Sequence, residues 1–363
     1  MDQNEKAFLC TLHCVNGIGT KSLWKIKEVF GSFQACYEAS NHQLQASFLA
    51  KDVVDSIVDI RSSDPEVRLN RMVADGIKTV TWDEDAYPAM LRHISNPPYI
   101  LYYRGQIEYL YSPTIALIGS RLASYYGKNT ARRLGRELAA RGITVVSGLA
   151  RGIDSEAHRG ALEAGYTVAV LGCGLDIIYP PENEKLYSEI TANGAIISEF
   201  PRHTGPEPGN FPQRNRIISG LCRGIVVVEA QEKSGALITA DFALEQGRDV
   251  FAVPGPINSK TSVGTNNLIK QGAKLVAGCQ DITEEYSDVV DSNEPVPLEQ
   301  SGLPFLTGEE NQIIEAIGND PGHFDYLLDK TGFNIGQLST LLLQLELRGI
   351  IRALPGNYYI KQA

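Results

Sequence analysis

The sequence lacks an excess of positive charge, and this at first argues against a nucleic-acid partner. Its 33 lysines and arginines are outnumbered by 43 aspartates and glutamates, for a net charge of −10. The imbalance is confined to the C-terminal quarter, where residues 275–363 hold four basic and fourteen acidic side chains. The first 274 residues are therefore neutral on average and can carry a local positive face.

Cysteines and long apolar runs are also scarce. The six cysteines are scattered through apolar surroundings, which predicts buried thiols and no disulfide framework. Cys10 and Cys14 share one face of a predicted helix, but with no second ligand pair nearby we expect packing and no metal. No segment approaches membrane-spanning length, and the N-terminus lacks a basic segment followed by an apolar one. We expect a cytoplasmic protein with no membrane partner.

The remaining composition, 43% apolar with 34 glycines, predicts a globular chain of two or three domains. Residues 1–66 have the pattern of a small all-α domain. Val15-Asn-Gly-Ile-Gly19 leads directly into a helical pattern over residues 21–30, as in a helix-hairpin-helix or SAM-like domain. Its glycines would let the backbone approach a phosphate closely. A tight turn between two packed helices explains the same residues equally well.

Residues 67–284 predict an α/β domain, because apolar strand candidates alternate with helices. The strands are continuous runs of Val, Ile and Leu, a pattern typical of strands covered on both faces. We therefore expect a doubly wound, mainly parallel, Rossmann-like sheet that binds its ligand at the carboxyl ends of the strands. The predicted strands span residues 77–82, 99–103, 114–118, 144–147, 167–171, 195–198, 225–229, 250–253 and 274–276.

The C-terminal part of the chain predicts a linker and a small winged helix. Residues 285–302 are polar, proline-bearing and aperiodic, as in a linker. Residues 303–363 contain three helical patterns followed by a hairpin around Pro355-Gly-Asn357. The third helical pattern, residues 335–347, has no lysine or arginine, whereas a helix that enters a DNA groove needs cationic support. We expect this domain to be a protein-contact or regulatory element and not a reader of DNA.

The predicted phosphate site lies where strand 114–118 ends in Gly119-Ser120-Arg121. Such a strand end exposes backbone N–H groups beside a guanidinium, and a predicted helix over residues 124–141 begins directly after it. All three features could converge on one anion. Lys128 on that helix would form the rim, although the solvated face of an amphipathic helix explains this residue equally well. A second glycine-rich turn over residues 147–154 contributes Arg151 to the same edge.

A second candidate, Phe211-Pro-Gln-Arg214-Asn215-Arg216, places an aromatic ring close to two guanidiniums. Ring stacking combined with phosphate contacts is how proteins hold single-stranded nucleic acid without reading its sequence. We expect one arginine to face the ligand and the other to support it; alternatively, Arg216 pairs with Glu199 or Glu229 inside the fold. Ser234-Gly235 begins a further helix and offers another anion seat, although helix capping alone also explains these residues.

The sequence offers no catalytic residues and no cofactor motif. Asp154 and His158 lie one helical turn apart, but no serine or cysteine nucleophile has an evident basic partner. We therefore expect His158 to be a hydrogen-bonded structural residue. Gly172-Cys-Gly174 resembles a dinucleotide fingerprint only superficially, because Ile177 stands where the third glycine belongs. A nicotinamide enzyme is not expected, nor is a metal.

Motifs in a fixed order over residues 80–275 resemble those of the bacterial DNA-processing protein A family, also called DprA or Smf. The matching segments are residues 87–88, 96–98, 101–105, 119–121, 147–154, 157–158, 168–176, 179–180, 211–218, 234–240 and 253–255. Together they cover the predicted α/β domain densely, which makes the resemblance specific. The flanks resemble the small helical and winged-helix domains that members often carry.

The resemblance implies a homodimeric protein that binds single-stranded DNA, protects incoming DNA during natural transformation and helps to load the RecA recombinase. It implies binding without catalysis. It also implies an anion pocket formed by Gly119, Ser120 and Arg121, with stacking and phosphate contacts beside it from Phe211, Arg214, Asn215 and Arg216. Some members carry a basic residue just after Tyr-Pro, where this chain has Pro181.

The alternative is a nucleotide-processing enzyme of the lysine-decarboxylase-like (LOG) phosphoribohydrolase group, which resembles this chain in its Rossmann-like core, Gly-Ser-Arg turn and Pro-Gly loop. That group uses a Pro-Gly-Gly-x-Gly-Thr-x-x-Glu loop. This chain has Pro254-Gly-Pro256 and later Gly264-Thr-Asn-Asn-Leu268, so the glutamate is missing. The sequence therefore favours a binding protein over an enzyme.

Overall fold

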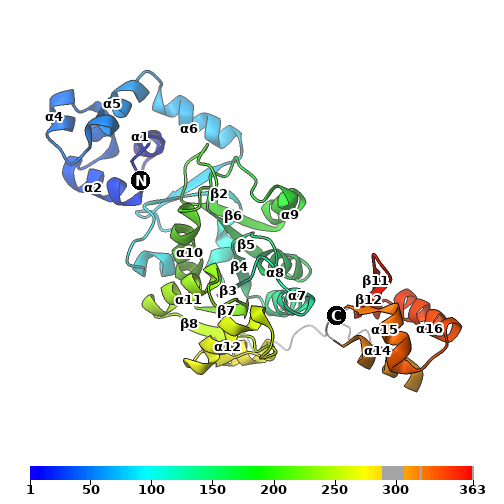
Figure 1. Ribbon diagram of the computed structural model, residues 1–363. Coiled ribbons are helices and arrows are strands. Elements are labelled where there is room, and N and C mark those ends of the chain that lie inside the picture. Colours follow the sequence, from blue (N-terminus) through cyan, green and yellow to red (C-terminus); the bar gives the residue numbers. More distant parts are fainter. Residues whose placement is uncertain (288–305, 319–320, 362–363) are drawn as a thin grey trace.

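The computed structural model describes residues 1–287, 306–318 and 321–361. They form an N-terminal helical unit, a central α/β domain and a C-terminal winged helix (Figure 1). This arrangement confirms the predicted fold class. Most of the predicted linker, residues 288–302, lies outside the described residues. Among the helices that the structure does describe, none is both long and apolar enough to cross a membrane.

Six short helices build the N-terminal unit, and the last of them continues past the predicted boundary at residue 66. Asp64 caps this helix by accepting the Glu66 N–H at 2.8 Å, and Pro65 occupies its first turn. Cap and proline together are a typical helix start. The helices are α1 (Gln3–His13), α2 (Thr20–Phe30), α3 (Phe33–Glu38), α4 (Asn41–Gln45), α5 (Lys51–Ile60) and α6 (Pro65–Ala74).

The turn between α1 and α2 requires Gly17. Its φ is +89°, and a Cβ at this position would lie 2.9 Å from Val53 Cγ2. Helix α2 then packs on the central domain, where the Thr20 hydroxyl donates to Glu199 at 3.2 Å and the Trp24 indole N–H donates to the Pro97 carbonyl at 3.0 Å. The glycine is needed because the backbone turns through a positive φ and passes close to Val53 of α5.

A nine-stranded sheet forms the central domain, in the order β1-β2-β6-β5-β4-β3-β7-β8-β9. The strands from β6 to β9 in this order are parallel, whereas β2 is antiparallel to both of its neighbours. Each predicted strand is present. Their bounds are β1 (Lys78–Thr81), β2 (Ile100–Gly105), β3 (Thr114–Gly119), β4 (Thr144–Ser147), β5 (Thr167–Leu171), β6 (Gly194–Ser198), β7 (Gly224–Glu229), β8 (Asp249–Ala252) and β9 (Lys274–Leu275).

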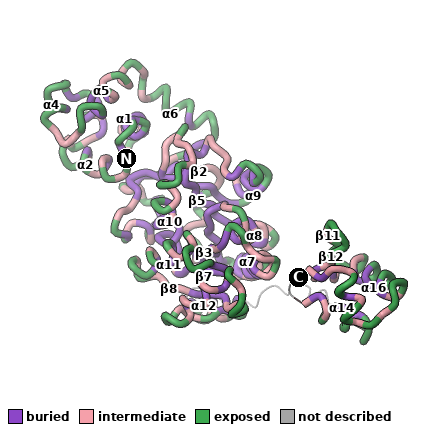
Figure 2. The backbone as a smooth tube through the Cα atoms, viewed as in Figure 1, coloured by how far each residue is buried: buried purple, intermediate pink, exposed green. Residues whose placement is uncertain are grey.

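Helices cover both faces of the sheet, and the central strands are buried along their length (Figure 2). Successive residues of a strand point to opposite faces, so Ile115 and Leu117 of β3 join one apolar cluster whereas Ala116 and Ile118 join another. The first cluster includes α7 (Tyr125–Ala139), α8 (Ile153–Leu162) and α13 (Gln280–Thr283); the second includes α10 (Asn210–Leu221), α11 (Gly235–Glu245) and α12 (Val263–Lys270). Helix α9 (Glu184–Asn193) packs with the N-terminal unit's cluster.

The winding of the sheet reverses at β3. Strand β4 pairs with one edge of β3 and β7 pairs with the other. Because α7 follows β3 on one face and α11 follows β7 on the other, the loops after these two strands diverge. A crevice opens between diverging loops at the carboxyl ends of the strands, which is where doubly wound sheets bind their ligands.

The C-terminal unit is a winged helix with its own apolar core. Its first helix begins at a capping box, in which Thr307 Oγ accepts the Glu310 N–H at 3.2 Å and the Glu310 carboxylate accepts the Thr307 N–H at 2.8 Å. The predicted three helices and hairpin are all present. They are α14 (Gly308–Ile317), β10 (Gly322–His323), α15 (Phe324–Thr331), α16 (Ile335–Leu347), β11 (Ile351–Leu354) and β12 (Tyr358–Lys361).

Candidate nucleic-acid interface

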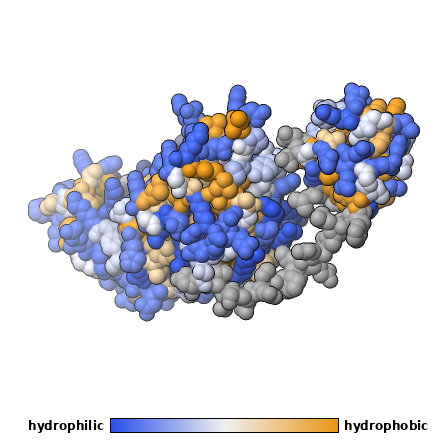
Figure 3. Space-filling model, turned by 90° about the horizontal axis from the view of Figure 1, so that it is seen from below, coloured by the Kyte–Doolittle hydropathy of each residue, from blue (hydrophilic) through white to orange (hydrophobic). Residues whose placement is uncertain are grey.

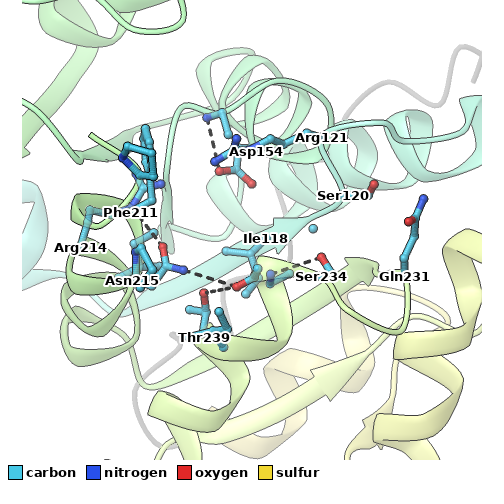
Figure 4. A pocket seen from close by; sticks show the side chains of 18 of the residues that line it. Ile118, Ser120, Arg121, Asp154, Phe211, Arg214, Asn215, Gln231, Ser234 and Thr239 are labelled. Carbon is cyan, nitrogen blue, oxygen red and sulfur yellow. Dashed lines mark hydrogen bonds between the residues drawn. The ribbon is translucent and has the colours of Figure 1, made fainter. Parts of the chain in front are cut away.

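A pocket of about 610 Å³ lies in the crevice beside β3 (Figure 4). The loops that follow β3, β4 and β7 line it, together with the first turns of α10. The predicted site residues that line it are Gly119, Ser120, Arg121, Phe211, Arg214, Asn215, Ser234 and Gly235. Three other predicted residues, Lys128, Arg151 and Arg216, lie outside its lining.

A buried carboxylate, that of Glu229 at the end of β7, occupies the start of α7. It accepts the Ser124 N–H at 2.9 Å and the Ser124 hydroxyl at 2.5 Å. The Ser120 N–H donates to the Glu229 carbonyl at 2.8 Å. The Ser120 amide, which we predicted to be free for a phosphate, is therefore already engaged, and so is the amide of Ser124, the cap of α7. The prediction is wrong for the Ser120 amide, and the protein's own carboxylate lies beside this helix N-terminus.

The loop beyond Ser120 stays open to a ligand. Within the described residues, the N–H groups of Arg121, Leu122 and Ala123 donate no hydrogen bond. The Arg121 side chain is exposed and pairs with no carboxylate in that part of the chain. Its guanidinium lies 5.2 Å from the centroid of the Phe211 ring, the geometry of a cation–π contact. The pocket mouth thus presents an uncompensated positive charge beside free backbone donors.

Phe211 forms an aromatic wall with Tyr179. The two ring centroids are 5.7 Å apart, and the Phe211 ring lies so close to Gly172 that a Cβ there would come within 3.0 Å of its Cδ1. The wall has Arg121 on one side and stays half-exposed, so a base could stack against it.

Several residues that line the pocket were not predicted as site residues, among them Tyr179 and Lys233. Tyr179 was quoted as part of a family motif but not as a site residue, and Lys233 was not singled out. Both line the pocket, and Lys233 is exposed there. A signal for Lys233 existed, because it directly precedes the helix cap Ser234. The partnership of Tyr179 with Phe211 had no local signal, because the two lie more than thirty residues apart.

Arg214 lines the pocket with a side chain that is almost fully buried. Its side chain is 4% exposed, and its Nη1 donates to the carbonyls of Val170 and Gly148, the latter at 2.7 Å. Burial lowers the pKa of Arg214 to about 10, although the neighbouring Asp154 opposes this shift. Arg214 therefore fixes the ends of two strands, and its predicted role as a free phosphate contact is replaced by a structural one.

Asn215 and the helix cap of α11 join the two walls of the crevice. The Asn215 Oδ1 accepts the Arg214 Nε–H at 3.2 Å, and its Nδ2 donates to the Gly235 carbonyl at 3.4 Å. Ser234 caps α11 by accepting the Ala236 N–H at 3.3 Å. The Asn215 side chain therefore links α10 to α11 across the pocket. Helix capping explains Ser234, which is the alternative that the sequence analysis left open.

Arg216 points away from the pocket into a buried ion pair. It contacts Glu199, and the two side chains are 9% and 5% exposed. The Thr20 hydroxyl also donates to Glu199. Burial raises the pKa of Glu199 despite the attraction of Arg216. The structure thus bears out the alternative that Arg216 pairs inside the fold and corrects the prediction that it contacts a ligand directly.

Removing one partner of this ion pair should cost stability without changing the pocket. We expect Arg216→Ala to lower the free energy of unfolding by about 3–5 kcal/mol, because Glu199 stays buried without its partner. Urea denaturation measures this loss. The double variant Arg216→Met, Glu199→Leu should recover most of it. An Arg216→Ala protein of unchanged stability would contradict the structural role.

The other two predicted basic residues, Arg151 and Lys128, do not line the pocket beside β3. Arg151 is exposed, contacts Glu182, and lines a small neighbouring cavity together with Arg121 and Tyr179. The Lys128 amine lies 5.7 Å from the centroid of the Tyr125 ring on its own helix. The structure therefore groups Arg151 with the aromatic wall but does not bring Lys128 to the pocket.

His158 is a structural residue, as expected. It is fully buried, and its Nδ1 lies 2.7 Å from the Thr167 hydroxyl. Burial lowers the pKa of His158 to about 3. The same cause lowers the pKa of His13 to about 4, where the ring contacts the Tyr102 hydroxyl at 3.0 Å. In both cases burial favours the neutral ring.

Because burial lowers the pKa of both histidines, we expect the free energy of unfolding to decrease in mild acid. Their folded pKa values lie below the unfolded value near 6.5, so stability is complete above that pH and falls as the pH drops towards 4. Each contributes up to about 1.4 kcal/mol per pH unit. Urea denaturation at pH 7, 6 and 5 should show the slope, and His158→Gln should reduce it. The exposed His42 offers the control His42→Gln, which should leave the slope unchanged.

A doubly wound domain with a cationic, aromatic crevice, accompanied by a helical unit and a winged helix, defines a Rossmann-like protein. Residues 78–287 match the family model of the DNA recombination-mediator protein A, and residues 297–357 match that of the DprA winged helix domain. The chain belongs to the DprA/Smf family of DNA-processing proteins.

Individual relatives agree with this assignment. Protein Smf of Synechocystis is 33% identical over an alignment of 395 residues that covers 99% of both chains. Protein Smf of Escherichia coli is 41% identical over 286 residues, covering 76% of this chain and 75% of the relative.

Solved structures of relatives share the fold. DprA from Streptococcus pneumoniae matches with a TM-score of 0.67 and 34% identity, over 77% of this chain and 97% of that one. The Helicobacter pylori protein, solved to describe its single-stranded DNA binding mode, matches with a TM-score of 0.54 and 33% identity, over 58% of this chain and 95% of that one.

Proposed function

We propose that this chain binds single-stranded DNA in the pocket beside β3, protects it, and helps to load a RecA-type recombinase on it. The observation that carries the proposal is the exposed Arg121, which pairs with no carboxylate among the described residues and lies against the Phe211 ring at the mouth of that pocket. A guanidinium and free amides suit a phosphate, and an open aromatic wall suits a base of any identity. Membership of a DNA-processing family and the DNA-binding mode described for the H. pylori relative support the same ligand.

A homodimer fits the surface of the central domain. Helix α11 exposes 41% of Ile238 and 62% of Leu244, and Figure 3, which views the molecule from the end that carries α11, β8 and α12, shows hydrophobic residues gathered on this face. Apolar patches of this kind mark protein contacts. Because α11 begins at Ser234, on the rim of the pocket, a partner on this face would lie close to the bound strand.

The enzyme alternative finds less support. Leu268 stands where the phosphoribohydrolase loop has its glutamate, and it is buried in the apolar core. The Pro254-Gly255 loop is closed by Asn266, whose Nδ2 donates to the Gly255 carbonyl at 3.0 Å and whose Oδ1 accepts the Gly255 N–H at 3.3 Å. Release of free base from a nucleoside monophosphate by the purified protein would favour the enzyme instead.

Removal of the exposed guanidinium should weaken binding to single strands of every sequence. We expect Arg121→Ala to lower the affinity by roughly fivefold to thirtyfold, because one charge-assisted phosphate contact is lost. The slope of log affinity against log salt should fall by about 0.7 for that contact. Fluorescence anisotropy with oligothymidylate measures both, and Lys185→Ala, at a side chain 91% exposed on α9, is the control. Wild-type affinity in Arg121→Ala would overturn the site.

Loss of the aromatic face should weaken binding without changing the salt slope. We expect Phe211→Ala to reduce the binding free energy by about 1–3 kcal/mol, the value of one stacked base. Phe211→Tyr keeps the ring and should retain most of the affinity. Equal losses in both variants would show that the ring acts through packing on Gly172 and not through stacking.

A further inference from the structure

A second pocket, of about 680 Å³, lies between the N-terminal helical unit and the central domain. Helices α1 and α6 line one side, and the loop after β6 lines the other. The two units are firmly joined here, because His13 contacts Tyr102 and the Lys6 amine pairs with Glu84 at 2.7 Å. Figure 1 shows α6 reaching from the helical unit to the region of β2. The cavity is therefore a built feature of the folded chain.

Three guanidiniums line this second pocket: those of Arg68, Arg71 and Arg202. Arg71 is exposed, and within the described residues its side chain has no ion-pair or hydrogen-bond partner. Across residues 1–287, 306–318 and 321–361, Arg68 donates only to the Ser63 hydroxyl, at 2.6 Å. An exposed guanidinium without a carboxylate keeps its full charge for an incoming anion.

The two carboxylates in the lining are already engaged. Asp64 caps α6 through the Glu66 N–H, and Asp75 pairs with Arg202 at 2.5 Å. Neither carboxylate pairs with Arg71. The side chains that line the pocket carry three guanidiniums against two carboxylates, in a protein whose overall charge is −10. Val67 and Pro201 add apolar surface on which a base can rest.

One loop connects the second pocket to the pocket beside β3. Pro206 and Pro208 line the first pocket, whereas Pro201, Arg202 and His203 line the second. His203 has φ +68°, an unfavourable backbone conformation for a residue with a side chain. Asp176 holds it there: its carboxylate accepts the His203 N–H at 3.0 Å and lies 2.8 Å from the His203 Nδ1. The loop is thus held in place between the two cavities.

We propose that a single strand of DNA that fills the first pocket continues over residues 201–208 and lays its phosphates against Arg68 and Arg71 of the second. The helical unit would then extend the binding site beyond the central domain. This inference rests on the proposed function, and it adds a dependence on strand length that the first pocket alone would not produce. A short strand occupies one pocket; a long strand occupies both.

The test compares oligothymidylates of about six and about twenty nucleotides. We expect Arg71→Glu to lower the affinity for the long strand by roughly threefold to tenfold and to leave the short strand unaffected. Lys51→Glu, at an exposed position on α5 outside the pocket, is the matched control. Equal effects on both lengths, or none on either, would overturn the inference. Failure of the wild-type protein to bind either length would instead refute the proposed function.

Cys14 supplies an independent readout. Of the six cysteines it alone is exposed, and it lines the second pocket. The long strand should slow alkylation of Cys14 by iodoacetamide, whereas the short strand should not. Protection by inorganic phosphate without protection by the long strand would identify a small-anion pocket and contradict the path. Thermal unfolding of Arg71→Glu should match that of the wild type, because Arg71 is exposed.

Discussion

The candidate site depends on the carboxylate of Glu229, which binds the start of α7 to the end of β7. In many doubly wound proteins the first helix N-terminus of the sheet is left free for a ligand phosphate. Here Glu229 accepts both the amide and the hydroxyl of Ser124, the cap of α7, so a carboxylate of the protein itself lies beside the positive end of this helix. The loop before the helix is thereby held between two fixed points. Within the described residues, the three amides of this loop donate no hydrogen bond, and the Arg121 side chain is exposed at the pocket mouth.

Burial divides the arginines around the crevice into two groups. Arg214 and Arg216 lie inside the fold, where desolvation is costly and each must find partners: backbone carbonyls for Arg214, and Glu199 for Arg216. Arg121 stays in solvent and keeps its charge free. The two buried arginines both belong to α10 and fasten this helix to the strand ends and to Glu199. Phe211, in the first turn of the same helix, is thereby held beside Arg121. Stiff support beneath an open, cationic and aromatic surface suits a flexible polyanion, because the protein does not have to order itself when it binds.

Much of the fold could be predicted from the sequence because its signals are local. The continuous apolar runs located each strand of the sheet, and the capping pattern before Pro65 could have shown that the helical unit extends past residue 66. The site was harder to predict. Gly119-Ser120-Arg121 was recognised, yet the partner that occupies the adjacent helix start, Glu229, lies over a hundred residues away. Likewise Arg214 and Arg216 are two residues apart in the same motif as Phe211, and nothing in that spacing indicates that both guanidiniums turn inward.

The sequence by itself determined the strands, the doubly wound class, the winged helix and the chemical character of the crevice, because alternation, apolar runs and turn residues act over a few positions. Only the tertiary structure decided which charges are free. Whether a guanidinium meets a ligand or a carboxylate depends on which distant segments fold against it, and burial makes that choice energetically decisive. Arg121 contacts the Phe211 ring, and Arg216 pairs with Glu199. Tyr179 contacts Phe211 from another loop. Such pairings arise from the packing of the whole sheet and not from any local pattern.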